Sequence, residues 1–214
     1  MKAVVFDMDG VLFDTERLCQ DSWLAVARED GLPGMDEIFP QCIGRNANDS
    51  RRIVMRAYGE DFDYEGFRQR ASDWFWDHIE KNGLPMKPGV REILTWLRKE
   101  GWLIGLASST RRSTVSNHLE QAGIGGYFSA VVTGDMVEYS KPRPDIYLMA
   151  CRELGVEPAQ AYAIEDSPNG IRSAYAAGMA PLMVPDMIAP DEEMVRLSKR
   201  IFKDLGEVLS FFKA

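Results

Sequence analysis

Two aspartates near the start of the chain, Asp7 and Asp9, have a spacing that suits chemistry on a charged substrate. They directly follow Val4–Phe6, an apolar run that predicts a buried strand. Residues two apart on an extended chain point to the same side, and two neighbouring anions repel each other unless a cation lies between them. Gly10 then lets the backbone turn at the carboxyl end of the strand, where open α/β sheets bind ligands. The pattern indicates a metal ion and a charged substrate, although Asp-x-Asp-Gly is also a common turn composition.

Further polar side chains follow the later apolar runs that predict strands. Because parallel strands deliver the residues after them to one edge of the sheet, we expect these side chains to gather near Asp7 and Asp9. They are Ser108, Ser109 and Thr110 after 103–107, Asp135 and Lys141 after 130–133, and Glu165 and Asp166 after 161–164.

Such a set of groups is suited to phosphoryl transfer. An ionised carboxylate can attack phosphorus, and a second carboxylate can protonate the leaving oxygen and later deprotonate water. Mg²⁺ prefers carboxylate, carbonyl and water oxygens and can bridge to the phosphate. Fixed hydroxyl and ammonium donors would balance the charge on the transferred oxygens.

From residue 87 onward the chain alternates between helical and strand patterns. Helices are predicted over 90–100, 113–122, 144–154 and 171–177, and strands over 103–107, 130–133, 161–164 and 181–184. A glycine, the residue that most easily takes the left-handed position after a helix, follows each of these four helices. The alternation predicts an α/β fold with a Rossmann-like parallel sheet. A short edge strand at 201–202 and helices over 192–197 and 205–212 would complete it.

The stretch 14–86 carries apolar positions at helical spacing and no alternating strand pattern. We expect helices over 16–30, 35–40, 50–58 and 65–79, which would form an inserted all-helical cap domain. The core domain would then comprise 1–13 and 87–214. The segments Phe13–Thr15 and Gly83–Met86 would link the two domains, so that the cap can act as a lid over the strand ends.

Composition narrows the class of protein. The chain has 214 residues, 45% of them hydrophobic, and a formal net charge of −8 without a long basic run, so no nucleic-acid partner is expected. No apolar run approaches the roughly 20 residues that span a bilayer, and no signal peptide is evident. The scattered Cys19, Cys42 and Cys151 indicate neither a disulfide framework nor a zinc site. We expect a soluble cytoplasmic monomer without membrane partners.

Four segments together resemble the motifs of the haloacid dehalogenase (HAD) superfamily, in the branch of β-phosphoglucomutase-like sugar-phosphate phosphatases. The segments are Asp7–Val11, Leu106–Ser108, Ser140–Asp145 and Ile164–Gly170. Each motif alone is moderately specific, but the order of all four, with a helical insertion after the first, is similar to this family over nearly the whole chain. The resemblance implies a Mg²⁺-dependent phosphatase that acts on a small phosphorylated metabolite.

The resemblance also implies a role for each matching residue. Asp7 would be the nucleophile and a metal ligand, and Asp9 the general acid/base, bound to the metal through its main-chain carbonyl. The second Asp is absent from the metal-independent dehalogenases, so its presence indicates phosphate esters. The remaining implied roles are phosphate binding by Ser108, Ser109 and Lys141 and metal binding by Glu165 and Asp166.

Several of these residues also have a purely structural interpretation. Ser108 could cap a helix N-terminus, but Thr110 lies nearer to the expected helix start, which favours a ligand role for Ser108. Lys141 could be a solvated loop lysine. The pair Glu165–Asp166 could be helix N-terminal carboxylates that the helix dipole favours.

Two arginines are candidates for contact with the rest of the substrate. Arg111 is either solvated or in contact with a second anionic group. The family's mutases place an arginine three residues after a lid glycine, to grip a second phosphate, whereas Arg45 here directly follows Gly44. The mutases also carry a histidine where this chain has Cys19, which cannot form the same hydrogen bonds. Both departures favour a phosphatase, with a β-phosphoglucomutase-like mutase as the alternative.

Two other classes use similar residues. A phospho-acceptor switch also combines an Asp, Mg²⁺, a hydroxyl and a Lys on a parallel sheet, but it needs a shorter chain and no lid, and Asp9 would promote hydrolysis of the phospho-Asp. A catalytically silent binding protein is the third alternative. The isolated His78 and His118 are expected to be structural.

Overall fold

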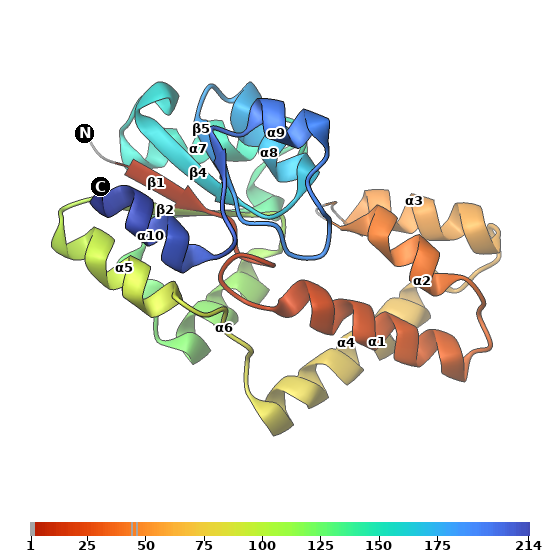
Figure 1. Cartoon of the computed structure of the whole chain (residues 1–214). Helices are drawn as coiled ribbons and strands as arrows, with labels where there is room; N and C mark the ends of the chain where they lie inside the picture. Colours follow the sequence, from red (N-terminus) through yellow and green to blue (C-terminus); the bar gives the residue numbers. More distant parts are fainter. Residues whose placement is uncertain (1–2, 44, 46) are drawn as a thin grey trace.

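A parallel sheet of six strands forms the centre of the computed structural model, which describes residues 3–43, 45 and 47–214 (Figure 1). The strand order β3-β2-β1-β4-β5-β6 puts β1 between β2 and β4. This arrangement confirms the Rossmann-like α/β fold expected from the sequence. The strands are β1 Ala3–Phe6, β2 Leu103–Ser108, β3 Ala130–Thr133, β4 Ala161–Glu165, β5 Ala180–Met183 and β6 Arg200–Ile201.

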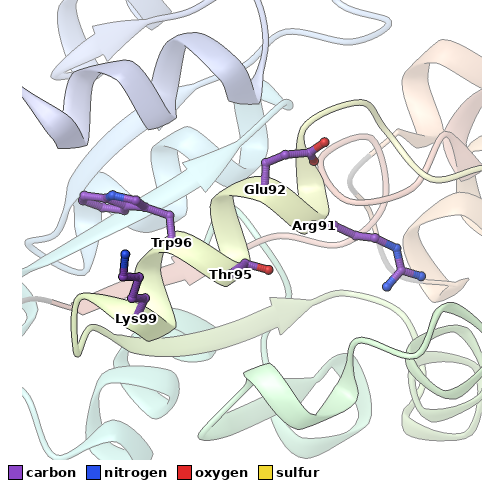
Figure 2. Close-up of a pocket in the computed structure, with 5 residues that line it drawn as sticks. All are labelled: Arg91, Glu92, Thr95, Trp96 and Lys99. Atoms are coloured by element: carbon purple, nitrogen blue, oxygen red, sulfur yellow. The ribbon is translucent and has the colours of Figure 1, made fainter.

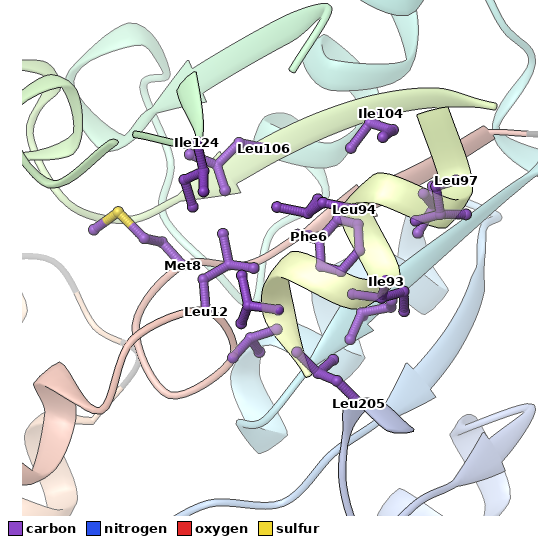
Figure 3. Close-up of a cluster of buried hydrophobic side chains, with 14 of the residues drawn as sticks. Phe6, Met8, Leu12, Ile93, Leu94, Leu97, Ile104, Leu106, Ile124 and Leu205 are labelled. Carbon is purple, nitrogen blue, oxygen red and sulfur yellow. The ribbon is translucent and has the colours of Figure 1, made fainter. Parts of the chain in front are cut away.

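Helices cover both faces of this sheet. Alternate residues of β1 point to opposite faces, so Val4 and Phe6 pack with α5, α6 and α10, while Ala3 and Val5 pack with α7 and α8. Figure 3 shows Phe6 inside the first of these two cores. The helices are α5 Val90–Lys99, α6 Arg112–Ala122, α7 Asp145–Leu154, α8 Pro168–Ala176, α9 Glu192–Leu197 and α10 Leu205–Lys213, with 3-10 turns η2 Gly125–Tyr127, η3 Gly134–Met136 and η4 Pro158–Gln160.

The helix ends follow local capping chemistry. The four glycines predicted to follow helices all have positive φ. Helix α8 begins three residues earlier than expected, at Pro168, because Ser167 Oγ accepts a 3.1 Å hydrogen bond from the main-chain N–H of Gly170. Among the described residues, no helix combines the length and the apolar character needed to cross a membrane.

The inserted region forms a helical layer with its own core. Trp23, which is 2% exposed, makes edge-on ring contacts with Phe39 at 5.2 Å and Phe67 at 5.5 Å, so that helices distant in sequence share one cluster. Truncation of such an aromatic side chain costs about 3–5 kcal/mol. The elements are α1 Thr15–Glu29, α2 Met35–Ile38, η1 Phe39–Cys42, α3 Ala47–Tyr58 and α4 Tyr64–Asn82.

The two linkers between the layers run side by side. The main-chain N–H of Asp14 donates to the carbonyl of Pro85 at 2.8 Å, and that of Lys87 donates to the carbonyl of Leu12 at 2.9 Å. Since each crossing is held by the other, the chain passes between the two layers as one two-stranded linker. We infer that the domain boundaries lie in this linker, near residues 13/14 and 86/87.

The loop after β5 makes a further connection between the layers. Asp186 accepts a 2.7 Å hydrogen bond from Lys87 Nζ, which also donates to Asp14 at 3.0 Å. The next two residues, Met187 and Ile188, pack against the cap's hydrophobic cluster. This loop therefore contacts the core, the linkers and the cap at once.

Candidate active site

The carboxyl ends of the central strands bring the first site residues together. Because β1 is in register with β2 and β4, Asp7, Ala107 and Glu165 stand at the same level on neighbouring strands. Two acidic groups separated by 158 positions thus face each other only because their strands are adjacent.

Lys141 reaches between these two acidic groups from the loop before α7. Its Nζ donates to Asp7 Oδ1 at 2.5 Å, to Glu165 Oε1 at 2.6 Å and to the carbonyl of Ala107 at 3.0 Å. Burial lowers the pKa of Lys141, but the charges and hydrogen bonds of Asp7 and Glu165 outweigh it and hold this pKa above its usual value. Lys141 is only 3% exposed, which rules out the alternative interpretation that it is a solvated loop lysine.

Tyr147 on α7 provides a further hydrogen bond to Glu165. Its hydroxyl donates to Glu165 Oε1 at 2.6 Å, while Ser167 Oγ donates to Glu165 Oε2 at 3.2 Å. Burial first, and then the Glu165 charge, raise the pKa of Tyr147, so the phenol remains a neutral donor. Sequence reasoning missed Tyr147 because it lies on the apolar face of a helix, where a tyrosine looks like an ordinary core residue.

Three carboxylates form a cluster that fits a metal ion. Oxygens of Asp7, Glu165 and Asp166 lie within 4.8 Å of one another. Burial raises the pKa of Asp7, against the opposing charge of Lys141, and burial followed by the Glu165 charge raises the pKa of Asp166. One ammonium cannot balance three buried carboxylates, and an all-oxygen donor set is the kind that Mg²⁺ prefers.

The backbone approaches this cluster closely at Gly10. A Cβ built on Gly10 would lie 2.3 Å from Asp166 Oδ2, and the φ of this residue is +83°. Both the space and the left-handed backbone require glycine here. The chain that carries Asp9 therefore passes directly beside the acidic cluster.

The Asp9 carboxylate accepts hydrogen bonds from three hydroxyls. Oδ1 accepts a 2.5 Å hydrogen bond from Thr15, and Oδ2 accepts bonds from Thr110 at 2.7 Å and Ser108 at 3.4 Å. These contacts hold Asp9 beside Asp7 without making its side chain a cluster member. Thr110 was expected near Asp7 and Asp9, whereas the contact from Thr15, a residue of the outgoing linker, was not predicted.

Ser108 does not cap α6. It is fully buried, and its Oγ accepts a 3.1 Å hydrogen bond from the main-chain N–H of Thr110. The start of α6 is instead held by Asp135, which accepts from the main-chain N–H of Arg112 at 3.1 Å and lies outside the cluster. Ser109 is half-buried, and its carbonyl oxygen would lie 2.1 Å from a Cβ built on Gly134.

The two candidate arginines are not drawn into these contacts. Arg111 is exposed at the N-cap of α6. Arg45 is also exposed, and its Nε donates to the carbonyl of Gln41 at 2.9 Å. The lid glycine, Gly44, lies outside the described residues.

Comparison with known proteins agrees with this geometry. The family model of haloacid dehalogenase-like hydrolases matches residues 1–178. The chain belongs to the haloacid dehalogenase-like hydrolases. It is 34% identical over 184 residues to a phosphorylated carbohydrates phosphatase of Thermotoga maritima, covering 84% of this chain and 82% of that protein.

Other relatives of this chain include a mutase and a protein of known crystal structure. The chain is 31% identical over 185 residues to β-phosphoglucomutase of Bacillus subtilis, covering 84% and 81% of the two proteins. Its fold matches the crystal structure of CbbY from Rhodobacter sphaeroides in complex with phosphate, with a TM-score of 0.81, 25% identity and coverage of 96% and 95%. Relatives of this hydrolase thus include both a phosphatase and a mutase.

Two surface hollows of this hydrolase lie outside the candidate active site. One, of about 410 Å³, lies along α5 between Arg91 and Lys99 (Figure 2). The other, of about 370 Å³, is lined by residues of β6 and α10 such as Arg200 and Phe211. Neither includes a residue of the strand-end cluster, so the candidate active site is defined by its polar groups and not by these hollows.

Proposed function

We propose that this hydrolase is a Mg²⁺-dependent phosphatase that releases phosphate from small phosphomonoesters through an aspartyl-phosphate intermediate. The observation that carries this proposal is the contact of Lys141 with both Asp7 and Glu165, beside Asp166. This contact places the proposed nucleophile and a fixed cation together with the three carboxylates that could bind a metal ion, at one edge of the sheet.

The proposed reaction has two displacement steps at phosphorus. A carboxylate oxygen of Asp7 attacks phosphorus, the bond from phosphorus to the ester oxygen breaks, and Asp9 donates its proton to the departing alcohol. Asp9 then removes a proton from water, which attacks the phosphorus of phospho-Asp7 and releases phosphate. Lys141, Ser108 and Ser109 hold the phosphoryl oxygens in this scheme.

The acidic residues would hold the metal. Asp7, Glu165 and Asp166 supply carboxylate oxygens, and Asp9 supplies its main-chain carbonyl. When bound, Mg²⁺ supplies positive charge that offsets the charge of the phosphoryl oxygens and of the cluster. Burial disfavours the ionised form of Asp7, so Lys141 and the metal together would keep it charged for attack.

The names of the relatives favour sugar phosphates as substrates. A sugar phosphomutase is the second candidate, because β-phosphoglucomutase of Bacillus subtilis is among the relatives. Cys19 is half-buried at the position of the mutase histidine, and burial raises its pKa to about 12, so it is a neutral thiol that cannot replace an imidazole. This favours water over a sugar hydroxyl as the final acceptor.

We further propose a cytoplasmic location. The three cysteines of this hydrolase are free thiols, as is usual for proteins of reducing compartments. A charged phosphorylated metabolite does not cross membranes unaided, so the enzyme would work where its substrate is formed.

The test is phosphate release from a panel of phosphorylated metabolites with and without Mg²⁺, and isomerisation of glucose 1-phosphate as the mutase readout. Phosphate release should require Mg²⁺ and should be abolished by Asp7→Asn, because an amide is a poor nucleophile. Near-normal turnover of Asp7→Asn would reject the proposal. Isomerisation faster than hydrolysis would favour the mutase, and a phosphoenzyme that persists for minutes would favour the switch protein.

A further inference from the structure

The carboxylate of Glu165 is held by hydrogen bonds to both of its oxygens. Oε1 accepts from Lys141 Nζ and from the Tyr147 hydroxyl, each at 2.6 Å. Oε2 accepts from the main-chain N–H of Asp166 at 3.2 Å, and from the main-chain N–H and the Oγ of Ser167 at 3.4 Å and 3.2 Å. A carboxylate offers about four lone-pair positions, so these contacts fix the orientation of the Glu165 side chain.

The first turn of α8 closes one side of this carboxylate. A Cβ built on Gly170 would overlap the carboxylate carbon and both oxygens of Glu165, so the backbone of the helix lies directly against the group. Ser167 caps the same turn with the Oγ that donates to Glu165. Because this turn is capped and Glu165 is fully buried, the carboxylate cannot move toward α8.

Tyr147 forms the opposite side and contacts both members of the buried ion pair. Its hydroxyl donates to Glu165, and Lys141 Nζ lies 5.2 Å from the centroid of its ring. Tyr147 is fully buried in the core that α7 forms with β1 and β2. Since interiors are close-packed, the hydroxyl has a fixed position from which to hold Glu165.

The Tyr147 hydroxyl also affects how Lys141 divides its hydrogen bonds. Lys141 uses all three of its N–H groups, and the acceptors are Asp7, the carbonyl of Ala107 and Glu165. Without the hydroxyl, the ammonium would be the remaining donor to Glu165 Oε1 among the described residues. Glu165 would then attract the ammonium more strongly and draw it away from Asp7. The hydroxyl therefore helps to keep Lys141 between the two carboxylates.

We propose that Tyr147 is a positioning residue of the candidate active site, whose hydroxyl fixes Glu165 and thereby sets the affinity of the acidic cluster for Mg²⁺. This inference rests on the proposed phosphatase function, because it concerns the metal site on which that function depends. Mg²⁺ requires near-ideal octahedral geometry, so carboxylates that are already fixed favour its binding. Removal of the hydrogen-bond partners of metal-site residues costs about 10- to 100-fold in metal affinity or activity.

A purely structural role for the hydroxyl leads to a different expectation. If the hydroxyl only satisfies a buried carboxylate, its loss lowers the stability of the metal-free protein and leaves the affinity for Mg²⁺ unchanged. A positioning role changes the affinity itself. Direct measurement of Mg²⁺ binding, together with thermal unfolding in EDTA, separates the two roles.

The test is Tyr147→Phe, which removes the hydroxyl and keeps the ring beside Lys141. Isothermal titration calorimetry with MgCl₂ should show a Kd that is about 10- to 100-fold higher than in the unmodified protein. The MgCl₂ concentration for half-maximal phosphate release from p-nitrophenyl phosphate should rise by a similar factor. An unchanged Kd would overturn the positioning role and leave the phosphatase proposal intact.

A matched control lies in the cap. Tyr64 is 4% exposed, and its hydroxyl has no hydrogen-bond partner among the described residues. Tyr64→Phe deletes the same atom from another buried tyrosine and should leave the Kd for MgCl₂ as in the unmodified protein. An equal rise of the Kd in the two variants would overturn the proposal, because the effect would then not depend on the contact with Glu165.

Gly170→Ala tests the other side of Glu165 without the loss of any donor. The added methyl group overlaps the carboxylate and must displace it, whereas alanine suits a helix better than glycine. This variant should also raise the Kd for MgCl₂, and it serves if Tyr147→Phe folds poorly. An unchanged Kd would show that the position of Glu165 does not control metal affinity, and would likewise overturn the proposal.

The unmodified protein separates this inference from the proposed function. If it binds MgCl₂ but hydrolyses no phosphate ester, the phosphatase proposal fails, and the Kd values of the variants still decide the role of Tyr147. If it binds no MgCl₂, both proposals fail.

Discussion

Lys87 and Asp186 form a 2.7 Å ion pair that joins the returning linker to the loop after β5. The Asp186 side chain is only 6% exposed, and the same lysine also binds Asp14 on the outgoing linker. Burial lowers the pKa of Lys87, but its hydrogen bonds to Asp186 and Asp14 leave this pKa above its usual value. The pair thus ties both linkers to the core at the base of the cap.

Removal of this pair should loosen the base of the cap. Lys87→Met is expected to lower the free energy of unfolding by about 1.5–3 kcal/mol, because hydrogen bonds to charged groups are lost and Asp186 is left buried. Urea unfolding measures the change. The more exposed Arg172–Glu193 pair is the matched control, and Glu193→Gln there should lower the free energy of unfolding less than Lys87→Met does. Equal losses in the two variants would contradict a special role for Lys87.

Thr15 should control the second step of the proposed reaction. Thr15→Val removes the 2.5 Å hydrogen bond to Asp9, so water activation should slow by about 10- to 100-fold and phosphorylated Asp7 should accumulate. Rapid quench with a ³²P-labelled substrate measures the phosphoenzyme. Thr15→Ser keeps the hydroxyl and should restore turnover. A normal phosphoenzyme level in Thr15→Val would show that Asp9 does not depend on this contact.

Lys141 should matter for both stability and activity. Lys141→Met leaves Asp7 and Glu165 buried without their cation, which is expected to cost about 3–5 kcal/mol of unfolding free energy and to abolish phosphate binding. Saturating Mg²⁺ should recover part of the lost stability by supplying positive charge. The exposed Lys99 provides the control through Lys99→Met, which should alter neither property. Unchanged kinetics in Lys141→Met would make Lys141 a structural residue only.

Metal binding should raise thermal stability. At a Mg²⁺ concentration about 100 times the Kd, stabilisation of about 2.7 kcal/mol is expected, and Tm should rise by about 2–4 °C per kcal/mol for a chain of this size. Differential scanning calorimetry with EDTA or Mg²⁺ measures the shift. Asp166→Asn removes one cluster carboxylate and should reduce it. A Tm that does not respond to Mg²⁺ in the unmodified protein would count against the proposed metal site.

His118 should make the protein less stable in mild acid. It is 1% exposed, packs against Phe13, and neither ring nitrogen has a hydrogen-bond partner among the described residues. Burial, only partly opposed by the Asp9 charge, lowers the pKa of His118 below 6.5. The unfolded chain therefore binds more protons than the folded one as pH falls below 6.5, and stability should decline by up to about 1.4 kcal/mol per pH unit.

The substitution His118→Phe isolates this effect. The variant cannot take up the proton, so the difference in unfolding free energy between pH 7.5 and pH 5 should be smaller than in the unmodified protein. His78 is present in both proteins and cancels in the comparison. The same pH dependence in both would assign the acid sensitivity to other groups.

The order of strands and helices could be predicted because it depends on local patterns. Apolar runs, helical spacing and terminal glycines all lie within a few residues of the element that they predict. Parallel strands then bring the residues that follow them to one edge of the sheet. The residue types of the site could be anticipated for the same reason. Helix α8 shows the limit, since its start depends on the hydroxyl of Ser167, which the apolar pattern does not reveal.

Only the tertiary structure decided which polar groups meet and how deeply they are buried. Lys141 and Asp7 are 134 positions apart, and Thr110 and Asp9 are 101 apart, so no local pattern links them. The same packing buries Tyr147 against Glu165, aligns Arg68 with Trp23, and leaves Arg45 and Arg111 in solvent. The sequence by itself determined the chemistry available at the strand ends. The packing of distant helices onto that edge selected the side chains that can use it, because hydrogen bonds and burial depend on distances in space.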